Sequence, residues 1–243
     1  MLRRHKYILI ALAVYWPAVF VLTHIPVPQI AAQSGMSDKT MHVMAYFSLT
    51  FLIWCAVSPY NRAHWNAAKP WIVVLCILVY AVIDEVLQMP VGRQAEVSDF
   101  LANLFGMALA MSIVSIFRFW SALLAAMATV VFVLSNLSHL TLLYPQFYLN
   151  TAFHLIAYTG LTLIWIQHID QYLKLDRRRA IWPLTAALAP LAMLGASLAF
   201  GYWQGKPLWP IDIATAVFGI LTAVLVSRVT LAFSHAAKQS TSK

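Results

Sequence analysis

Residues 71–87 read WIVVLCILVYAVIDEVL, an apolar run that ends beside two adjacent carboxylates, Asp84 and Glu85. The run lacks the polar and apolar alternation of a membrane barrel strand, so it predicts a helix that crosses a bilayer. Of the 243 residues in the chain, 62% are hydrophobic and 10% are charged, whereas a soluble domain has roughly 25% charged residues. This composition excludes a soluble globular domain and a disordered chain.

Apolar stretches of similar length precede and follow this run, and each approaches the roughly 20 residues that a bilayer-spanning helix needs. We therefore predict an all-α polytopic membrane protein with about eight spans. The predicted spans are residues 7–23, 41–57, 71–87, 99–117, 120–137, 151–168, 183–200 and 211–233.

The lysine and arginine positions predict the orientation of these spans. With a cytoplasmic N-terminus, 13 of the 16 basic residues fall on the cytoplasmic side, and Lys39, Arg93 and Lys206 fall outside. The positive-inside rule therefore places both termini in the cytoplasm. The basic residues form no stripe interleaved with aromatic residues, so we expect membrane lipids and no nucleic acid as partners.

The acidic residues gather on the opposite side. Only Asp170 and Asp176 fall in the cytoplasm under this orientation. Carboxylates contribute little to orientation, so their placement carries information about function. We expect a polar site that faces the extracytoplasmic side, where the outer helix ends carry Asp38, Asp84, Glu85, Glu96, Asp99 and Asp212.

The chain also resembles itself at an offset of 112 or 113 residues. His42-Val-Met-Ala-Tyr46 matches His154-Leu-Ile-Ala-Tyr158, and Asp99 with Phe105-Gly106 matches Asp212 with Phe218-Gly219. We predict two parallel four-helix repeats, residues 1–118 and 119–243. The second has Ser197 and Ala216 in place of acidic and amide residues of the first, so we expect it to act mainly as a scaffold.

The polar residues of the first repeat have helical spacing. Asp38, His42 and Tyr46 share one helical face, as do Asp99, Asn103 and Gly106. Gly106 allows a neighbouring helix to approach closely. The candidate catalytic residues are Asp84, Glu85, Asp99 and His42, and the candidate substrate-binding residues are Lys39, Tyr46, Gln88, Arg93 and Asn103.

Three chemistries fit these residue types. Asp84, Glu85 and Asp99 could hold a divalent cation such as Mg²⁺ while Arg93 and Lys39 bind a phosphate. A carboxylate and His42 could act as general acid and base. The same groups could instead recognise a headgroup or a peptide-like ligand without chemistry. The spacing alone does not select among these three.

Structural roles compete with these functional ones. Ser37 and Ser98 are suitable helix N-caps, and Asp38 and Asp99 would then complement the helix dipole. His42 could be a core histidine, and Arg93 a counter-ion. Adjacent carboxylates near a membrane helix end are the hardest to explain structurally, because burial penalises them unless they are paired, protonated or metal-bound.

The order of these residues resembles the VanZ-like family of bacterial membrane proteins. The pattern is D-K-x-x-H-x-x-x-Y at 38–46, D-E-x-x-Q at 84–88 and R-x5-D-x3-N-x-x-G at 93–106. The resemblance covers residues 20–117, and residues 132–233 resemble a degenerate second unit. It implies the bacterial cytoplasmic membrane, a link to the cell envelope and low-level teicoplanin resistance, and it implies no established reaction.

Three functions remain open from the sequence. The first is a membrane protein that binds an envelope component or a lipophilic glycopeptide at its outer face. The second is an intramembrane enzyme that acts on a lipid-linked phosphate substrate. The third is a transporter, which parallel repeats permit but which a polar cluster at one membrane face disfavours compared with one at the midplane.

Overall fold

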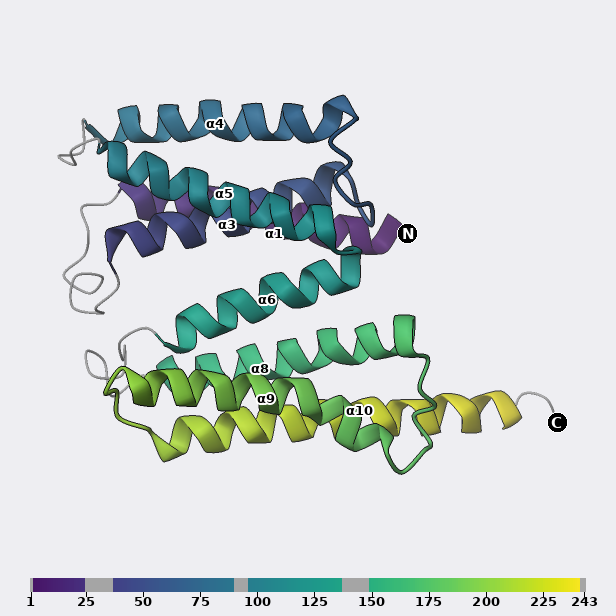
Figure 1. Ribbon diagram of the computed structural model, residues 1–243. Coiled ribbons are helices and arrows are strands. Elements are labelled where there is room, and N and C mark those ends of the chain that lie inside the picture. Colours follow the sequence, from purple (N-terminus) through teal and green to yellow (C-terminus); the bar gives the residue numbers. More distant parts are fainter. Residues whose placement is uncertain (1, 25–36, 90–95, 137–148, 241–243) are drawn as a thin grey trace. The chain divides into compact units, whose positions relative to one another are not determined.

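The computed structural model describes residues 2–24, 37–89, 96–136 and 149–240. All regular structure in these ranges is helical (Figure 1), which confirms the predicted all-α class. The elements are α1 (Leu2–His24), α3 (Asp38–Val57), α4 (Ala68–Gln88), α5 (Val97–Ile116), α6 (Phe119–Ser135), α8 (Leu149–His168), the π-helical turn η3 (Ile169–Leu173), α9 (Trp182–Trp203) and α10 (Pro210–Ser240).

Six of the described helices are long and apolar enough to cross a bilayer, which supports a membrane protein. The remaining two, α1 and α6, contain shorter apolar stretches, His5–Val21 and Phe119–Ser135. A helix of this length extends about 25 Å, at the lower end of what a span requires. The prediction of eight spans therefore depends on α1 and α6. The six longer segments are residues 38–57, 68–88, 97–116, 150–173, 182–203 and 210–230.

The chain divides into two compact units, residues 1–126 and 127–243. The predicted repeat boundary, 118/119, lies at the start of α6, and the assignment of repeats remains a prediction. Each unit is described by itself below.

In the first unit, α3 and α5 form the closest helix pair, and α1 and α4 pack beside them. Gly106 makes the close approach possible. A Cβ atom on Gly106 would lie 2.3 Å from the Val43 carbonyl oxygen and 2.9 Å from the Phe47 backbone nitrogen, both on α3. The sequence-based expectation for Gly106 is therefore confirmed, and this contact sets the spacing of the two helices that carry most of the polar residues.

The end of this unit that lies away from the polar residues is fixed by indole hydrogen bonds. Trp54 Nε1 donates to the Asn61 carbonyl at 3.1 Å, and Trp65 Nε1 donates to Ser115 Oγ at 3.0 Å. The Ala63 amide donates to the Val114 carbonyl at 2.9 Å. Tryptophan suits a membrane interface because its ring is apolar and its N–H is polar.

In the second unit, α8 and α10 form the closest pair, and α9 packs against both. Ile166, Trp182 and Ala186 belong to its buried core. After η3, the chain turns at Lys174, whose φ of 49° lies in the left-handed region. The Arg177 guanidinium, in the turn that follows, pairs with Asp170 and donates to the Ser227 carbonyl at 2.8 Å.

Candidate functional site

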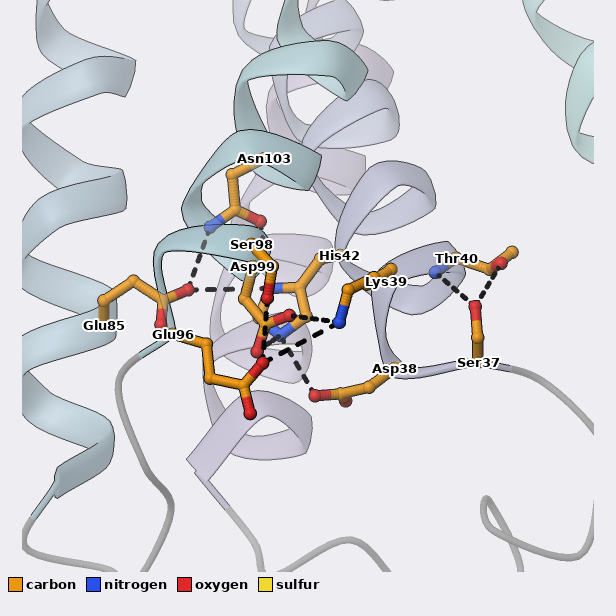
Figure 2. A network of polar contacts seen from close by, with 10 residues as sticks. All are labelled: Ser37, Asp38, Lys39, Thr40, His42, Glu85, Glu96, Ser98, Asp99 and Asn103. Carbon is orange, nitrogen blue, oxygen red and sulfur yellow. Dashed lines mark hydrogen bonds and ion pairs between the residues drawn. The ribbon is translucent and has the colours of Figure 1, made fainter.

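Three helix ends of the first unit meet at one place. The N-terminal ends of α3 and α5 and the C-terminal end of α4 bring polar side chains together there (Figure 2). Ser37 caps α3 as predicted, because its Oγ accepts a hydrogen bond from the Thr40 amide at 3.2 Å. Ser98 is not the cap of α5. The helix starts at Val97, Glu96 is its N-cap, and the Ser98 hydroxyl donates to Glu96 Oε2 at 2.8 Å.

His42 lies at the centre of this cluster and is 2% exposed. Its Nδ1 lies 2.9 Å from Asn103 Oδ1 and 3.8 Å from Glu85 Oε1. On the other side of the ring, Nε2 lies 3.9 Å from Asp38 Oδ2 and 3.9 Å from Asp99 Oδ2. One imidazole therefore contacts polar groups from α4 and α5 and a carboxylate of its own helix.

Asn103 connects His42 to Glu85. Asn103 Nδ2 donates to Glu85 Oε1 at 3.2 Å, which leaves Asn103 Oδ1 toward His42. All three side chains are buried. The resulting chain from Glu85 through Asn103 to His42 fixes the orientation of the imidazole ring, as an outer-shell hydrogen bond does for a histidine that binds a metal or transfers a proton.

The mouth of the cluster carries a lysine and a further carboxylate. Lys39 Nζ lies 3.7 Å from Glu96 Oε2 and 3.8 Å from Asp99 Oδ1, and its side chain is 56% exposed. Asp99 is 4% exposed. Lys39 therefore lies at the exposed mouth of the site, and the buried Asp99 lies behind it.

Asp84 and Glu85 face different partners although they are adjacent in sequence. Glu85 contacts Asn103 and His42, whereas Asp84 Oδ2 accepts a hydrogen bond from the Tyr46 hydroxyl at 3.2 Å. Successive residues of a helix point about 100° apart, so the two carboxylates lie on different sides of α4. The structure does not bring them together as one cation-binding pair.

His24 belongs to the Asp84 side of the site and is not among the residues predicted from the sequence. Its Nδ1 lies 3.9 Å from Asp84 Oδ1. The sequence does carry a signal for His24. Residues 20–23 (FVLT) resemble residues 132–135 (FVLS), and each stretch is followed by a polar residue, His24 and Asn136. A polar residue at both positions sets this helix end apart from the apolar run before it.

The two remaining predicted residues have different outcomes. Gln88 is 1% exposed, and its Nε2 has no hydrogen-bond partner among the residues that the structure describes. Arg93 lies outside the described residues, so its predicted role as a substrate-binding residue stays a prediction.

One group of side chains in the described ranges has the donor atoms and the proximity that a metal ion requires. Asp38, His42 and Asp99 each present one ligand atom, and these atoms lie within 4.8 Å of one another. This set shares Asp99 with the predicted cation ligands. The other two predicted ligands, Asp84 and Glu85, are not in this set, and Asp38 and His42 take their place.

The second unit has a polar pocket where the N-terminal ends of α8 and α10 meet the C-terminal end of α9. Asp212 accepts hydrogen bonds from Asn150 Nδ2 and, at 2.8 Å, from Thr151 Oγ1. Lys206 Nζ donates to the Asn136 carbonyl, and burial lowers the pKa of Lys206. The pocket is lined by these side chains together with His154 and Ser197, among others.

Comparison with known proteins gives one match. The family model described as VanZ/LLP1 matches residues 7–118, which include every described member of the first-unit site. No curated protein and no solved structure matches the chain. The resemblance read from the polar pattern of residues 38–106 is thus confirmed, and residues 7–118 form a VanZ-like unit of a protein with helices that could span a membrane. The resemblance of residues 132–233 to a second such unit stays a prediction.

Proposed function

We propose that this chain is a VanZ-like protein of the bacterial cytoplasmic membrane that binds an envelope component or a lipophilic glycopeptide at an extracytoplasmic polar site. The supporting observation is the convergence of Glu85, Asp99 and His42, from three helices, at 6%, 4% and 2% exposure. Ionisable groups inside a membrane protein are costly, and they therefore indicate function when they gather at one place.

The orientation follows from the charge distribution along the chain. Placing the polar site outside puts 13 of 16 basic residues on the cytoplasmic side. Both termini are then cytoplasmic, and the site faces the cell wall. A site in this position is accessible to lipid-linked wall precursors and glycopeptide drugs on the outer side of the membrane.

The charge of the site favours ligands that donate hydrogen bonds or carry positive charge. Asp38, Glu85 and Asp99 lie within 4 Å of His42. Lys39 pairs with Glu96 and with Asp99. Amide and ammonium groups of a peptide-like ligand match such a surface. Binding a glycopeptide there would reduce the amount of drug that reaches its target and would thereby give tolerance to teicoplanin-type compounds.

An enzyme that acts on a lipid-linked phosphate is the second candidate, and one observation favours it. The Glu85–Asn103–His42 chain orients the imidazole in the way that general bases and metal-binding histidines are oriented. In this reading His42 exchanges a proton with the substrate, and Lys39 contacts its phosphate at the mouth of the site.

Native mass spectrometry of the detergent-solubilised chain tests both candidates. The wild type, Asp99→Asn and Asp212→Asn are incubated with polyprenyl-phosphate lipids and with a lipidated glycopeptide. Asp212→Asn is the matched control, because Asp212 stands 113 residues after Asp99. A ligand held unchanged by the wild type and by Asp212→Asn, but lost in Asp99→Asn, supports the binding protein. A lipid that is converted to a new mass by the wild type and by Asp212→Asn, but not by Asp99→Asn, supports the enzyme. The absence of any adduct or product contradicts both candidate functions.

We also propose that the two units are copies of one ancestral unit. Two pairs of contacts support this. Gly106 packs against Val43 and Phe47, and Gly219 packs against Leu155 and Thr159, each 112 or 113 residues later. Asp99 lies near Lys39, and Asp212 accepts from Thr151 at the corresponding position.

A further inference from the structure

We propose that Asp38, His42 and Asp99 form a binding site for one divalent transition-metal ion, of the Zn²⁺ or Mn²⁺ class. The inference deepens the proposed function, on which it rests for the role of the site. It replaces the all-carboxylate cation site expected from the sequence with a mixed histidine and carboxylate site. Its location is the side of His42 that faces away from Asn103 (Figure 2).

The hydrogen-bond chain behind His42 determines which ring nitrogen is available. Asn103 Nδ2 donates to Glu85 Oε1, so the Asn103 carbonyl oxygen is the atom that faces His42. His42 Nδ1 must then carry the proton that this carbonyl accepts. In the tautomer that carries its proton on Nδ1, Nε2 presents its lone pair to Asp38 and Asp99.

A lone pair and two carboxylate oxygens that face one another repel unless a positive charge lies between them. A proton on Nε2 does not fill this role well, because both oxygens are 3.9 Å away and an N–H···O bond needs about 2.7–3.2 Å. A metal ion satisfies all three atoms at once. Nitrogen and carboxylate oxygen bind Zn²⁺ at about 2.0–2.2 Å, so small side-chain movements of Asp38 and Asp99 would close the site.

The burial of Asp99 is a second, independent reason to expect a cation at this site. Asp99 is 4% exposed, and its Oδ1 has no hydrogen-bond donor among the described residues. The nearest ammonium, Lys39 Nζ, lies 3.8 Å from that oxygen and is shared with Glu96. A buried carboxylate with so little compensation is costly, and metal coordination is one of the few ways in which proteins hold such a group.

The second unit supplies an internal contrast. There the residues 112 after Asp38 and Lys39 are Asn150 and Thr151, and both donate hydrogen bonds to Asp212. Neutral donors thus satisfy the carboxylate that corresponds to Asp99. Asp212 belongs to no metal-ligand group in the part of the chain that the structure describes. The first unit keeps the donor set that a cation requires, and the second has exchanged it for hydrogen bonds.

The ligand types select the class of metal. Imidazole together with carboxylates suits Zn²⁺ or Mn²⁺, whereas Mg²⁺ and Ca²⁺ prefer oxygen ligands alone. Three protein ligands leave one position of a tetrahedral ion open. That position would accept water or a group of the ligand, which enters past the half-exposed Lys39.

The test measures metal binding directly on the full-length protein in detergent. The chain is stripped with a chelator and dialysed, and Zn²⁺ or Mn²⁺ is titrated calorimetrically, with the bound metal counted by elemental analysis. The wild type and Asp212→Asn should each bind one equivalent of at least one of the two ions. Asp99→Asn, His42→Gln and Asp38→Asn should weaken binding about tenfold or more.

Asp38→Asn is the variant least expected to misfold, because the Asp38 side chain is 37% exposed and its amide replacement changes little packing. A loss of metal binding in this variant therefore reports the lost ligand. Absence of stoichiometric binding by the wild type overturns the proposal, as does binding that Asp38→Asn and Asp99→Asn leave unchanged. The glycopeptide and lipid incubations are repeated with and without chelator. Ligand binding that survives metal removal overturns the metal's role while the proposed function stands. Metal binding without any ligand binding supports the metal site and contradicts the proposed function.

Discussion

Gly106 has the tightest environment among the glycines of the described ranges. The Cβ of an alanine there would lie 2.3 Å from the Val43 carbonyl oxygen, and the backbone of α3 cannot yield as a side chain can. We expect Gly106→Ala to separate α3 from α5 and to cost about 1–3 kcal/mol or more. Thermal unfolding in detergent measures the loss. Metal affinity should fall with it, because His42 and Asp99 lie on the two separated helices.

Gly195→Ala is the matched control for this substitution. Gly195 lies inside α9, and an added Cβ would meet no atom within 4 Å. Alanine is a better helix former than glycine by about 1 kcal/mol, so this variant should unfold at the same or a slightly higher temperature. An equal loss of stability in both variants would contradict the assignment of Gly106 as the contact that sets helix spacing.

Tyr46 is fully buried, and its hydroxyl donates to Asp84 at 3.2 Å. Tyr46→Phe removes this donor and leaves a buried carboxylate less well satisfied, so we expect a loss of about 1–3 kcal/mol. The thermal midpoint of the purified variant reports it. Tyr202→Phe should leave the midpoint unchanged, because Tyr202 is 74% exposed. If both variants unfold like the wild type, the bond between Tyr46 and Asp84 contributes nothing to stability.

The sequence predicted which residues gather at this site better than it predicted how they pair. Helical spacing was enough to group Asp38 with His42 and Asp99 with Asn103, because spacing is a local property of each helix. The pairing of Asn103 with Glu85, and the role of His24, depend on how α1, α4 and α5 are rotated about their axes. No single apolar run contains that information.

The turn between η3 and α9 is held by one arginine. The Arg177 guanidinium pairs with Asp170 and donates to the Ser227 carbonyl on α10, and the Asp170 pair is two-pronged. Lysine keeps the charge but lacks the planar fork. We expect Arg177→Lys to loosen this turn and to speed tryptic cleavage there in inside-out vesicles. Trypsin cleaves after arginine and after lysine, so the cleavage rates of the wild type and of Arg177→Lys can be compared directly.

Arg178→Lys is the control for the turn, because the Arg178 side chain is exposed and its substitution removes no two-pronged pair. Its cleavage rate should match that of the wild type. Equal rates for Arg177→Lys and Arg178→Lys would show that the pair with Asp170 does not order the turn.

The helices themselves follow from local sequence, whereas their ends do not. Every predicted span overlaps a helix, since a bilayer leaves a helix as the way to satisfy the backbone of a long apolar run. The predicted N-cap of α5 was wrong. Glu96 is the N-cap in place of Ser98, and the Ser98 hydroxyl donates to the Glu96 carboxylate. The shortness of α6 matters more, since 17 residues are close to the minimum for a span.

Two shorter helices decide the topology of the entire chain. If α1 and α6 both cross, Lys39 and Gln204 lie outside while Arg62 and Arg178 lie inside. If α6 does not cross, α8, α9 and α10 each cross the bilayer in the opposite direction. Arg178 then lies outside and Gln204 inside. The positive-inside rule favours the first arrangement, because it keeps Arg177, Arg178 and Arg179 in the cytoplasm.

Single cysteines at these four positions, in a chain with Cys55→Ala and Cys76→Ser, test this arrangement. All four native side chains are exposed, so a membrane-impermeant maleimide can reach each one from its own side. In intact cells we expect labelling of Lys39→Cys and Gln204→Cys alone. Arg62→Cys and Arg178→Cys should react only after permeabilisation. Labelling of Lys39→Cys and Arg178→Cys together in intact cells would mean that α6 does not span. The two matching polar sites would then face opposite sides of the membrane, and the parallel arrangement of the repeats would be wrong.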